Sequence, residues 1–375
     1  MPSATTSALF TPIKIGQHLL KHRVVLPPMT RMRADDHGNP TEQYAEYYKQ
    51  RATPGGLLLT EATAISPSAG AFPHTAGIYT NDQIAAWKKV TDAVHEKGGI
   101  IFVQIWHGGR ASFSFLLPDN QSTVSASDIA IEGNSPFGAP YEKPRALEVE
   151  EIKSIIQDFV QAAKNAIAAG FDGVEIHGAN GFLVDQFINT SSNKRTDQYG
   201  GSIENRTRFA LEVVDATTKA IGDDKTAIRL SPWGGFHDMK DDTALATWSY
   251  ITEQLEKKHP HLAYLHFIEA RSDPMTDTPT ELKEGEKTET LDPFRALWSG
   301  PFISAGNYTY DMKSVFDRAE SSPNNLVAIG RAFIANPDLV ERLRNNWKLN
   351  PYDRATFYTS GPEGYTDYPF YDAKN

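Results

Sequence analysis

The residues most suited to carry out chemistry lie in one short stretch, Glu175-Ile-His-Gly-Ala-Asn-Gly-Phe182. It overlaps the end of a run typical of a buried strand, residues 171–176. The side chains of His177 and Asn180 can both donate a hydrogen bond to one carbonyl oxygen, which would stabilise the enolate formed when a nucleophile adds to a conjugated alkene. Phe182 follows at once and has no hydroxyl group to donate a proton. The same spacing also fits a core histidine followed by an asparagine turn.

Two glycines stand beside a donor side chain later in the sequence, in Gly306-Asn307 and Gly330-Arg331. Glycine lets backbone N–H groups approach an anion closely, and Arg331 would add a charge-assisted contact. Either pair alone fits an ordinary tight turn. Because the two pairs follow the last two predicted strands, together they indicate a phosphate site. We therefore predict a phosphorylated cofactor or substrate.

Thr30, Gln104 and Arg229 form a third polar set at the ends of predicted strands. A planar heterocycle with alternating carbonyls and ring nitrogens needs such donors and acceptors along its edge. A cation such as Arg229 would favour the reduced, negatively charged form of the ring. Taken singly, Arg229 fits a buried ion pair and Gln104 fits a satisfied interior amide.

Eight short apolar runs, most of them rich in β-branched residues, would position these side chains, and helix-like segments separate most of them. The predicted strands are residues 23–26, 56–60, 100–104, 173–176, 226–230, 263–267, 301–304 and 326–329. The clearest helix spans 151–169, where apolar residues share one face and Gly170 supplies a stop. Eight such units favour a closed (β/α)8 TIM barrel over an open sheet.

In such a barrel, chemistry lies at the C-terminal ends of the strands, where all three sets of residues fall. The sixth strand adds Glu269 and Arg271 at the same end. After the third strand comes a loop-like excursion, residues 107–146, which we interpret as a partial cover over the barrel mouth. The chain has no linker or low-complexity tract, so residues 1–375 are predicted to form a single domain.

The composition argues against several classes of protein. A net charge of −10 without Lys/Arg runs argues against a nucleic-acid partner. No apolar stretch is long enough for a membrane span, and the first residues lack a secretory pattern. There are no cysteines, no metal-ligand spacing and no Walker-type or Gly-x-Gly-x-x-Gly pattern. We expect a cytoplasmic protein that binds a small molecule and no metal.

Two long motifs carry a resemblance to a known family. The segments His177-Gly-Ala-Asn-Gly-Phe-Leu-Val-Asp-Gln-Phe187 and Asn193-Lys-Arg-Thr-Asp-Gln-Tyr-Gly-Gly-Ser-Ile-Glu-Asn-Arg206 resemble those of the old yellow enzymes, which are FMN-dependent ene-reductases. The similarity runs from residues 9–12 to residues 364–369, nearly the whole chain. It implies a (β/α)8 barrel with tightly bound FMN that NADPH reduces, acting on the C=C bond of an α,β-unsaturated aldehyde or ketone. Members vary in oligomeric state, so a monomer or a homodimer is expected.

The resemblance also implies a role for each matching position. His177 and Asn180 would bind the substrate carbonyl. Six residues would contact the flavin ring and four would hold its phosphate: Pro28, Met29, Thr30, Ala62, Gln104 and Arg229 for the ring, and Gly306, Asn307, Gly330 and Arg331 for the phosphate. Four aromatic residues would line the substrate pocket: Phe72, Trp106, Phe236 and Tyr358.

One position departs from the family pattern, because most members have a tyrosine where this chain has Phe182. That tyrosine protonates the α-carbon after hydride reaches the β-carbon, which Phe182 cannot do. We expect the enolate to rotate and return its hydride, so that the net reaction is alkene isomerisation, as in the Phe-bearing chanoclavine-I aldehyde isomerases of ergot-alkaloid biosynthesis. Two alternatives stay open: ordinary NADPH-dependent ene-reduction with water or another group as proton donor, and a non-catalytic barrel that binds flavin or phosphate.

Overall fold

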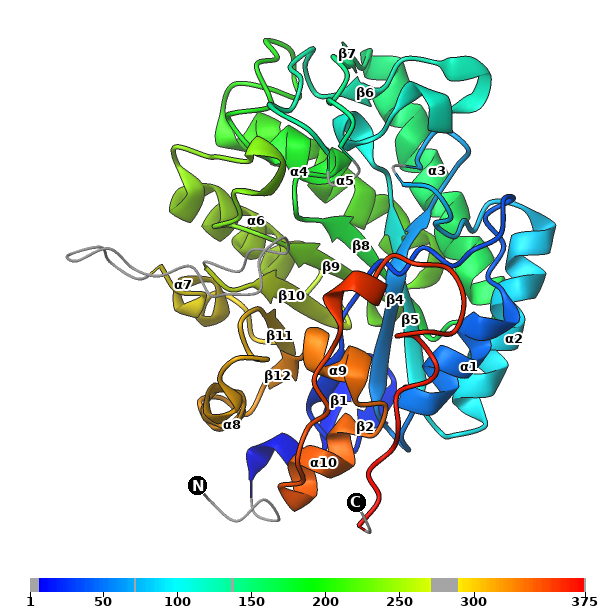
Figure 1. Cartoon of the computed structure of the whole chain (residues 1–375). Coiled ribbons are helices and arrows are strands. Elements are labelled where there is room, and N and C mark those ends of the chain that lie inside the picture. The colour runs from blue at the N-terminus through cyan, green and yellow to red at the C-terminus, as the bar shows by residue number, and fades with distance from the viewer. Residues whose placement is uncertain (1–6, 71, 136–137, 271–288, 374–375) are drawn as a thin grey trace.

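The computed structural model describes residues 7–70, 72–135, 138–270 and 289–373. Its eight barrel strands are β3 (Val24–Leu26), β4 (Leu57–Ala64), β5 (Ile100–Trp106), β8 (Gly173–Gly178), β9 (Thr226–Leu230), β10 (Tyr264–Ile268), β11 (Phe302–Ala305) and β12 (Asn325–Ala328). They are parallel and close in the order β10-β11-β12-β3-β4-β5-β8-β9 (Figure 1). Each predicted strand coincides with one of them to within a few residues, so the predicted (β/α)8 barrel is confirmed.

Helices surround the barrel and alternate with its strands (Figure 1). They are α1 (Glu42–Arg51), α2 (Asn81–His95), α3 (Val149–Ala168), α4 (Leu183–Ile188), α5 (Ile203–Ile221), α6 (Ala244–Lys258), α7 (Asp292–Ala296), α8 (Met312–Glu320), α9 (Arg331–Ala335) and α10 (Leu339–Asn345). In α3 the carboxylate of Glu151 accepts the Glu148 N–H at 2.8 Å, which caps the first turn. The helix ends before Gly170, whose φ of +87° only glycine adopts without strain. The observed helix thus begins two residues earlier and ends one residue earlier than the predicted helix, residues 151–169.

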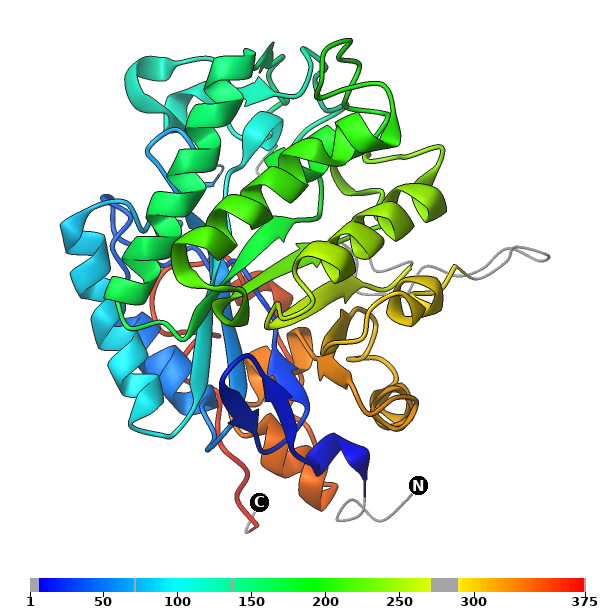
Figure 2. The ribbon, with the colours of Figure 1, turned by 180° about the vertical axis from the view of Figure 1, so that it is seen from behind.

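Apolar side chains fill the barrel toward the N-terminal ends of its strands, among them Val25, Leu57, Phe102 and Ile303. The same cluster includes Ile13, Ile15 and Leu20 of a hairpin formed by β1 (Ile13–Ile15) and β2 (His18–Leu20). In Figure 2 this dark-blue hairpin lies below the barrel strands. The hairpin therefore covers the N-terminal end of the barrel with apolar surface and leaves the C-terminal end for the polar residues.

The excursion between β5 and α3 is not a structureless loop. It contains three short 3-10 turns and a two-stranded sheet of β6 (Val124–Ser125) and β7 (Arg145–Ala146). Ala111 and Ile131 from this segment pack in one cluster with Trp106 and Phe182. The excursion is thereby fastened to the ends of β5 and β8.

Candidate active site

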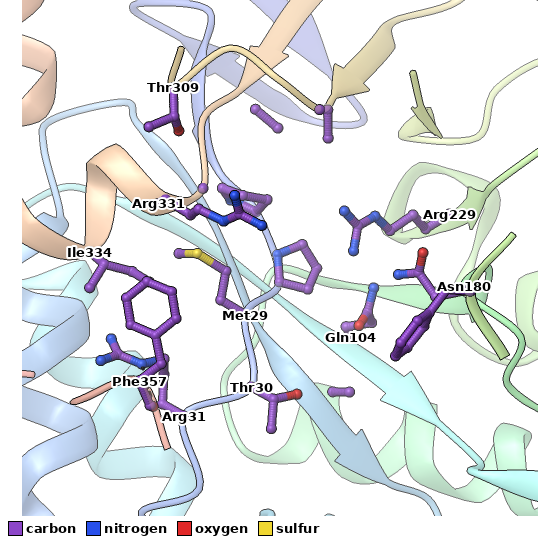
Figure 3. Close-up of a pocket in the computed structure, with 18 of the residues that line it drawn as sticks. Met29, Thr30, Arg31, Gln104, Asn180, Arg229, Thr309, Arg331, Ile334 and Phe357 are labelled. Atoms are coloured by element: carbon purple, nitrogen blue, oxygen red, sulfur yellow. Dashed lines mark hydrogen bonds between the residues drawn. The ribbon is translucent and has the colours of Figure 1, made fainter. Parts of the chain in front are cut away.

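One cavity lies at the C-terminal ends of the strands and gathers almost all of the predicted site residues. It is lined by Pro28, Met29, Thr30, Ala62, Phe72, Gln104, His177, Asn180, Phe182, Arg229, Phe236, Gly306, Asn307, Gly330, Arg331 and Tyr358. The pairing of β4 with β5 shifts between Leu59 and Ala62, which sets Ala62 opposite Gln104. Figure 3 shows Arg331 on one side of the cavity, with Gln104, Asn180 and Arg229 on the other.

The side of the cavity that holds Arg331 can bind an anion. Gly306 and Asn307 have φ of 126° and 60°, and Gly330 caps α9, whose first residue is Arg331. The Arg331 guanidinium donates to the hydroxyl of Tyr310, and the Ala332 N–H donates to Thr309 Oγ1 at 3.3 Å. Positive-φ backbone, a helix start and a guanidinium suit a phosphate. Sequence reasoning missed Thr309 and Tyr310, although both follow Gly306-Asn307 closely.

The opposite side can bind the edge of a polar ring. Gln104 Nε2 donates to Glu175 Oε1 at 2.7 Å, and Gln104 Oε1 is buried without a hydrogen-bond partner. Arg229 Nε is likewise buried without a partner. Burial lowers the pKa of Arg229, and the Glu175 charge opposes that shift. Unpartnered buried groups are costly, so this acceptor and donor fit a ligand whose ring N–H lies between carbonyls, as in the isoalloxazine of FMN.

The first two predicted catalytic residues present neutral hydrogen-bond donors. The Ala179 N–H donates to His177 Nδ1 at 3.3 Å, so Nε2 carries the ring proton. Burial, followed by the Arg229 charge, lowers the pKa of His177 well below its usual value, which keeps the ring uncharged at neutral pH. The Nε2–H of His177 and the amide of Asn180 are therefore available to a carbonyl oxygen in the cavity.

A hydrogen-bonded loop holds Asn180 in place. Asn180 and Gly181 have φ of 57° and 72°, and a Cβ on Gly181 would lie 2.6 Å from His237 Cβ, so only glycine fits there. The Asn180 N–H donates to Ser231 Oγ at 2.9 Å, and the Asn180 carbonyl accepts from His237 Nδ1 at 2.9 Å. The Gly181 N–H donates to Asp185 Oδ2 at 2.8 Å. Nothing in the local sequence pointed to His237 or Asp185.

Phe182 stands among aromatic rings. Its ring centroid lies 4.9 Å from that of His177, 5.2 Å from those of Trp106 and His237, and 6.2 Å from that of Phe72. None of these side chains carries a hydroxyl group. Trp106 is the one predicted pocket residue that does not line the cavity, because it is fully buried behind Phe182.

The excursion also lies differently from our expectation. None of its described residues, within 107–135 and 138–146, lines the cavity. It therefore backs the wall formed by Phe182 instead of covering the mouth of the barrel.

A segment near the C-terminal end completes the cavity with Phe357 and Tyr358. Arg31 Nε donates to the Phe357 carbonyl at 3.0 Å, and Arg33 Nε donates to the Gly361 carbonyl at 2.8 Å. The Arg31 N–H in turn donates to the buried Glu61 at 3.2 Å. This chain of contacts ties the segment to the end of β3.

At the sixth strand, Glu269 pairs with Arg318 at 3.1 Å outside the cavity, and Arg271 lies outside the described residues.

The described ranges lack two kinds of feature. They contain no group of three or more His, Asp or Glu residues that could hold a metal ion. No helix among them is long and apolar enough to cross a membrane.

Fold and site together define a class: a (β/α)8 barrel with a phosphate site on its last two strands, a polar ring-edge site and paired neutral donors, as in a flavin oxidoreductase. Residues 8–350 match the NADH:flavin oxidoreductase / NADH oxidase family. The chain therefore belongs to this family, that of the old yellow enzymes, and the resemblance is confirmed. It is an FMN-dependent oxidoreductase that uses a nicotinamide reductant.

Individual relatives match over almost their full length. The rice (Oryza sativa subsp. japonica) 12-oxophytodienoate reductase 1 is 49% identical, covering 98% of this chain and 94% of the relative. A solved structure of morphinone reductase is 42% identical, with a TM-score of 0.89, covering 99% and 98%. Another, of morphinone reductase in complex with tetrahydroNAD, is 43% identical with a TM-score of 0.88, covering 98% of each chain. These matches define the family and leave the ergot-alkaloid branch a prediction.

Proposed function

We propose that the chain, as a single FMN-binding domain, reduces the C=C bond of an α,β-unsaturated aldehyde or ketone, with NADPH as the reductant. The observation that carries this proposal is that one cavity unites the anion site, the ring-edge site and the donors of His177 and Asn180. The relatives named as 12-oxophytodienoate and morphinone reductases support a carbonyl-conjugated alkene as the substrate class.

In this proposal, FMN binds across the cavity from the ring-edge site to the anion site. Ten residues would hold it: Pro28, Met29, Thr30, Ala62, Gln104 and Arg229 at the ring, and Gly306, Asn307, Gly330 and Arg331 at the phosphate. Bound and reduced, FMN would supply the hydride for the β-carbon of the substrate. Phe72, Phe236 and Tyr358 would bound the substrate space, and Trp106 would support Phe182 from behind.

His177 and Asn180 would hold the carbonyl oxygen and stabilise its negative charge as the enolate forms. A preorganised donor of this kind contributes about 3–4 kcal/mol to the transition state. Because His177 is neutral, its Nε2–H strengthens as a hydrogen bond without giving up its proton to the oxygen. The site therefore favours formation of the enolate and leaves its protonation to another source.

Phe182 favours a second candidate function, alkene isomerisation of the chanoclavine-I-aldehyde type. If no proton reaches the α-carbon, the former double bond of the held enolate is single and can rotate. If the same hydride returned to the oxidised flavin, the C=C bond would be restored in the other geometry and the flavin would again be reduced, so no NADPH would be consumed. In the first candidate, solvent protonates the α-carbon and the product is saturated.

The colour of the purified protein tests the cofactor proposal against a non-catalytic phosphate-binding barrel. The protein should be yellow and should bleach when NADPH is added without oxygen. A colourless protein that takes up no FMN would contradict both enzyme proposals. A yellow protein that no nicotinamide bleaches would support a non-catalytic flavin carrier.

Phe182→Tyr tests the fate of the enolate. Pre-reduced wild type and variant are given chanoclavine-I aldehyde without oxygen, and saturated and isomerised products are measured. Cyclohexenone, whose ring double bond cannot isomerise, measures reduction alone. The new phenol should raise the saturated fraction because it supplies the missing proton. Phe72→Tyr, which adds a hydroxyl to a neighbouring ring 6.2 Å away, is the matched control. An isomerised product from wild type supports the second candidate, and a product ratio that Phe182→Tyr leaves unchanged would rule that candidate out.

A further inference from the structure

A polar layer crosses the inside of the barrel just below the cavity. It consists of Glu175 on β8, Gln104 on β5 and His266 on β10, and all three side chains are fully buried. Gln104 lines the cavity, whereas Glu175 and His266 do not. An ionisable pair in a barrel interior costs desolvation energy, and this pair contacts the cavity through Gln104.

The contacts of Glu175 fix the orientation of the Gln104 amide. Glu175 Oε1 accepts from Gln104 Nε2 at 2.7 Å, and Oε2 accepts from His266 Nδ1 at 2.8 Å. A carboxylate accepts hydrogen bonds and donates none, so it must face the NH2 group of Gln104. The amide oxygen then points away from Glu175, and this oxygen is the buried atom without a partner at the ring-edge site.

The same carboxylate acts on the charge of Arg229 from the neighbouring strand. Residue 229 pairs in register with His177 on one side and His266 on the other, next to the strand of Glu175. Burial lowers the pKa of Arg229, and the nearby charge of Glu175 raises it. A guanidinium alone would favour the negatively charged, reduced form of a bound ring, and Glu175 offsets part of that preference.

We propose that Glu175 is a positioning residue for the flavin, resting on the proposed function: it turns the Gln104 amide so that its oxygen accepts the N3–H of the ring, and it holds the reduction potential of FMN down by offsetting the charge of Arg229. His266 completes the arrangement by holding the second carboxylate oxygen. The two roles are separable because one depends on hydrogen-bond polarity and the other on charge.

Glu175→Gln removes the charge and keeps an acceptor for Gln104. Its amide oxygen can face Gln104, while its NH2 group donates to His266 Nδ1 after a tautomer change. The variant should hold reduced FMN at least tenfold more tightly relative to oxidised FMN than wild type does. For a two-electron couple, that ratio is a positive shift of about 30 mV in the midpoint potential. Spectroelectrochemical titration of the holoenzyme measures it.

Glu175→Leu removes the charge and the acceptor, so the Gln104 amide can turn. Wild type and Glu175→Gln should bind N3-methyl-FMN at least tenfold more weakly than FMN, because methylation removes the N–H that Gln104 accepts. The Leu variant should lose most of this discrimination. Fluorescence titration of apoprotein reconstituted with each flavin gives the two dissociation constants. If the Leu variant does not fold, Glu175→Gln alone decides the charge role, and Gln104→Leu decides the hydrogen-bond role.

Asp338→Asn serves as a matched control, because it removes a partly buried charge that pairs with Arg342 at 2.6 Å, away from the cavity. It should change neither the potential nor the flavin preference. A Glu175→Gln holoenzyme with the wild-type potential would overturn the charge role. A Leu variant that still discriminates against N3-methyl-FMN, or a Gln104→Leu variant that does so, would overturn the orientation role. A wild type that binds no FMN would instead overturn the proposed function itself.

Discussion

Asp185→Asn should change how the stability of the protein depends on pH. Asp185 is fully buried beneath the Asn180 loop, where its carboxyl accepts from the Gly181 N–H and from Asn189 Nδ2, both at 2.8 Å. Ser231 Oγ lies 3.3 Å from the same group. Burial raises the pKa of Asp185 from 3.8 to about 7, against the pull of these hydrogen bonds. The folded protein therefore keeps a proton here that the unfolded chain has lost by pH 5.

The magnitude follows from proton linkage. A group whose pKa is raised on folding stabilises the folded state fully below its unfolded pKa, and this stability is lost as the pH rises to the folded pKa. The loss is about 1.4 kcal/mol for each pH unit. Between pH 5 and pH 8, wild type should thus lose about 3 kcal/mol relative to Asp185→Asn, whose side chain does not titrate. At pH 5 the variant should be less stable by about 1–3 kcal/mol, because an amide cannot accept from both donors.

Thermal melts of both holoproteins from pH 5 to pH 8 measure this difference. The gap in Tm should narrow or reverse as the pH rises. Glu61, whose pKa burial also raises to about 7, titrates in both proteins and cancels. Asp197→Asn is the control: its hydrogen bonds with Arg195 lower the pKa of Asp197, so its contribution is complete above pH 4 and its gap should stay constant. A constant gap for Asp185→Asn would refute the reasoning.

Two further substitutions test the cavity directly. Arg331→Ala should weaken FMN binding about ten- to hundredfold, the worth of a charge-assisted hydrogen bond, with Arg331→Lys intermediate; fluorescence titration checks this, and unchanged affinity would remove Arg331 from the anion site. Asn180→Ala should lower kcat/KM for cyclohexenone about 10²–10³-fold while FMN content stays at the wild-type level; full activity would show that the carbonyl oxygen binds elsewhere.

Local sequence patterns were enough to predict the barrel and most of its cavity. Each β-branched run ends in a polar or glycine-rich turn, and parallel strands bring those ends to one face. That geometry alone places Thr30, Gln104, His177, Arg229 and Arg331 around one cavity. The contribution of distant residues to the site followed from the fold class and needed no knowledge of individual contacts.

The supporting contacts left no local trace. Arg31 and Phe357 are 326 residues apart, and no periodicity in either segment indicates that the Arg31 guanidinium donates to the Phe357 carbonyl. Glu175 lies inside an apolar strand, where a single polar residue reads as a solvent-facing position until the barrel closes around it. Trp106 and the excursion were misplaced for a related reason: strand alternation gives the side of the sheet on which a residue lies but not the ring that stands in front of it.

The surroundings of Phe182 decide where a proton for the enolate can come from. The nearest ring is that of His177, which is neutral and donates a hydrogen bond without acting as an acid. Two further ring nitrogens adjoin Phe182, Trp106 Nε1 and His237 Nε2, and both are buried without a partner. An indole N–H is too weak an acid to transfer its proton. His237 donates through Nδ1 to the Asn180 carbonyl, and burial lowers its pKa to about 4, so Nε2 carries no proton at neutral pH. Tyr141 packs against the same cluster, but it does not line the cavity, and burial raises the pKa of its phenol to about 12. None of these neighbours of Phe182 therefore replaces the missing phenol as an acid. In the proposed reaction, protonation would then fall to water from the open side of the cavity, where Tyr358 is exposed. The rate of that step against the return of hydride would set the balance between the two proposed outcomes, reduction and isomerisation.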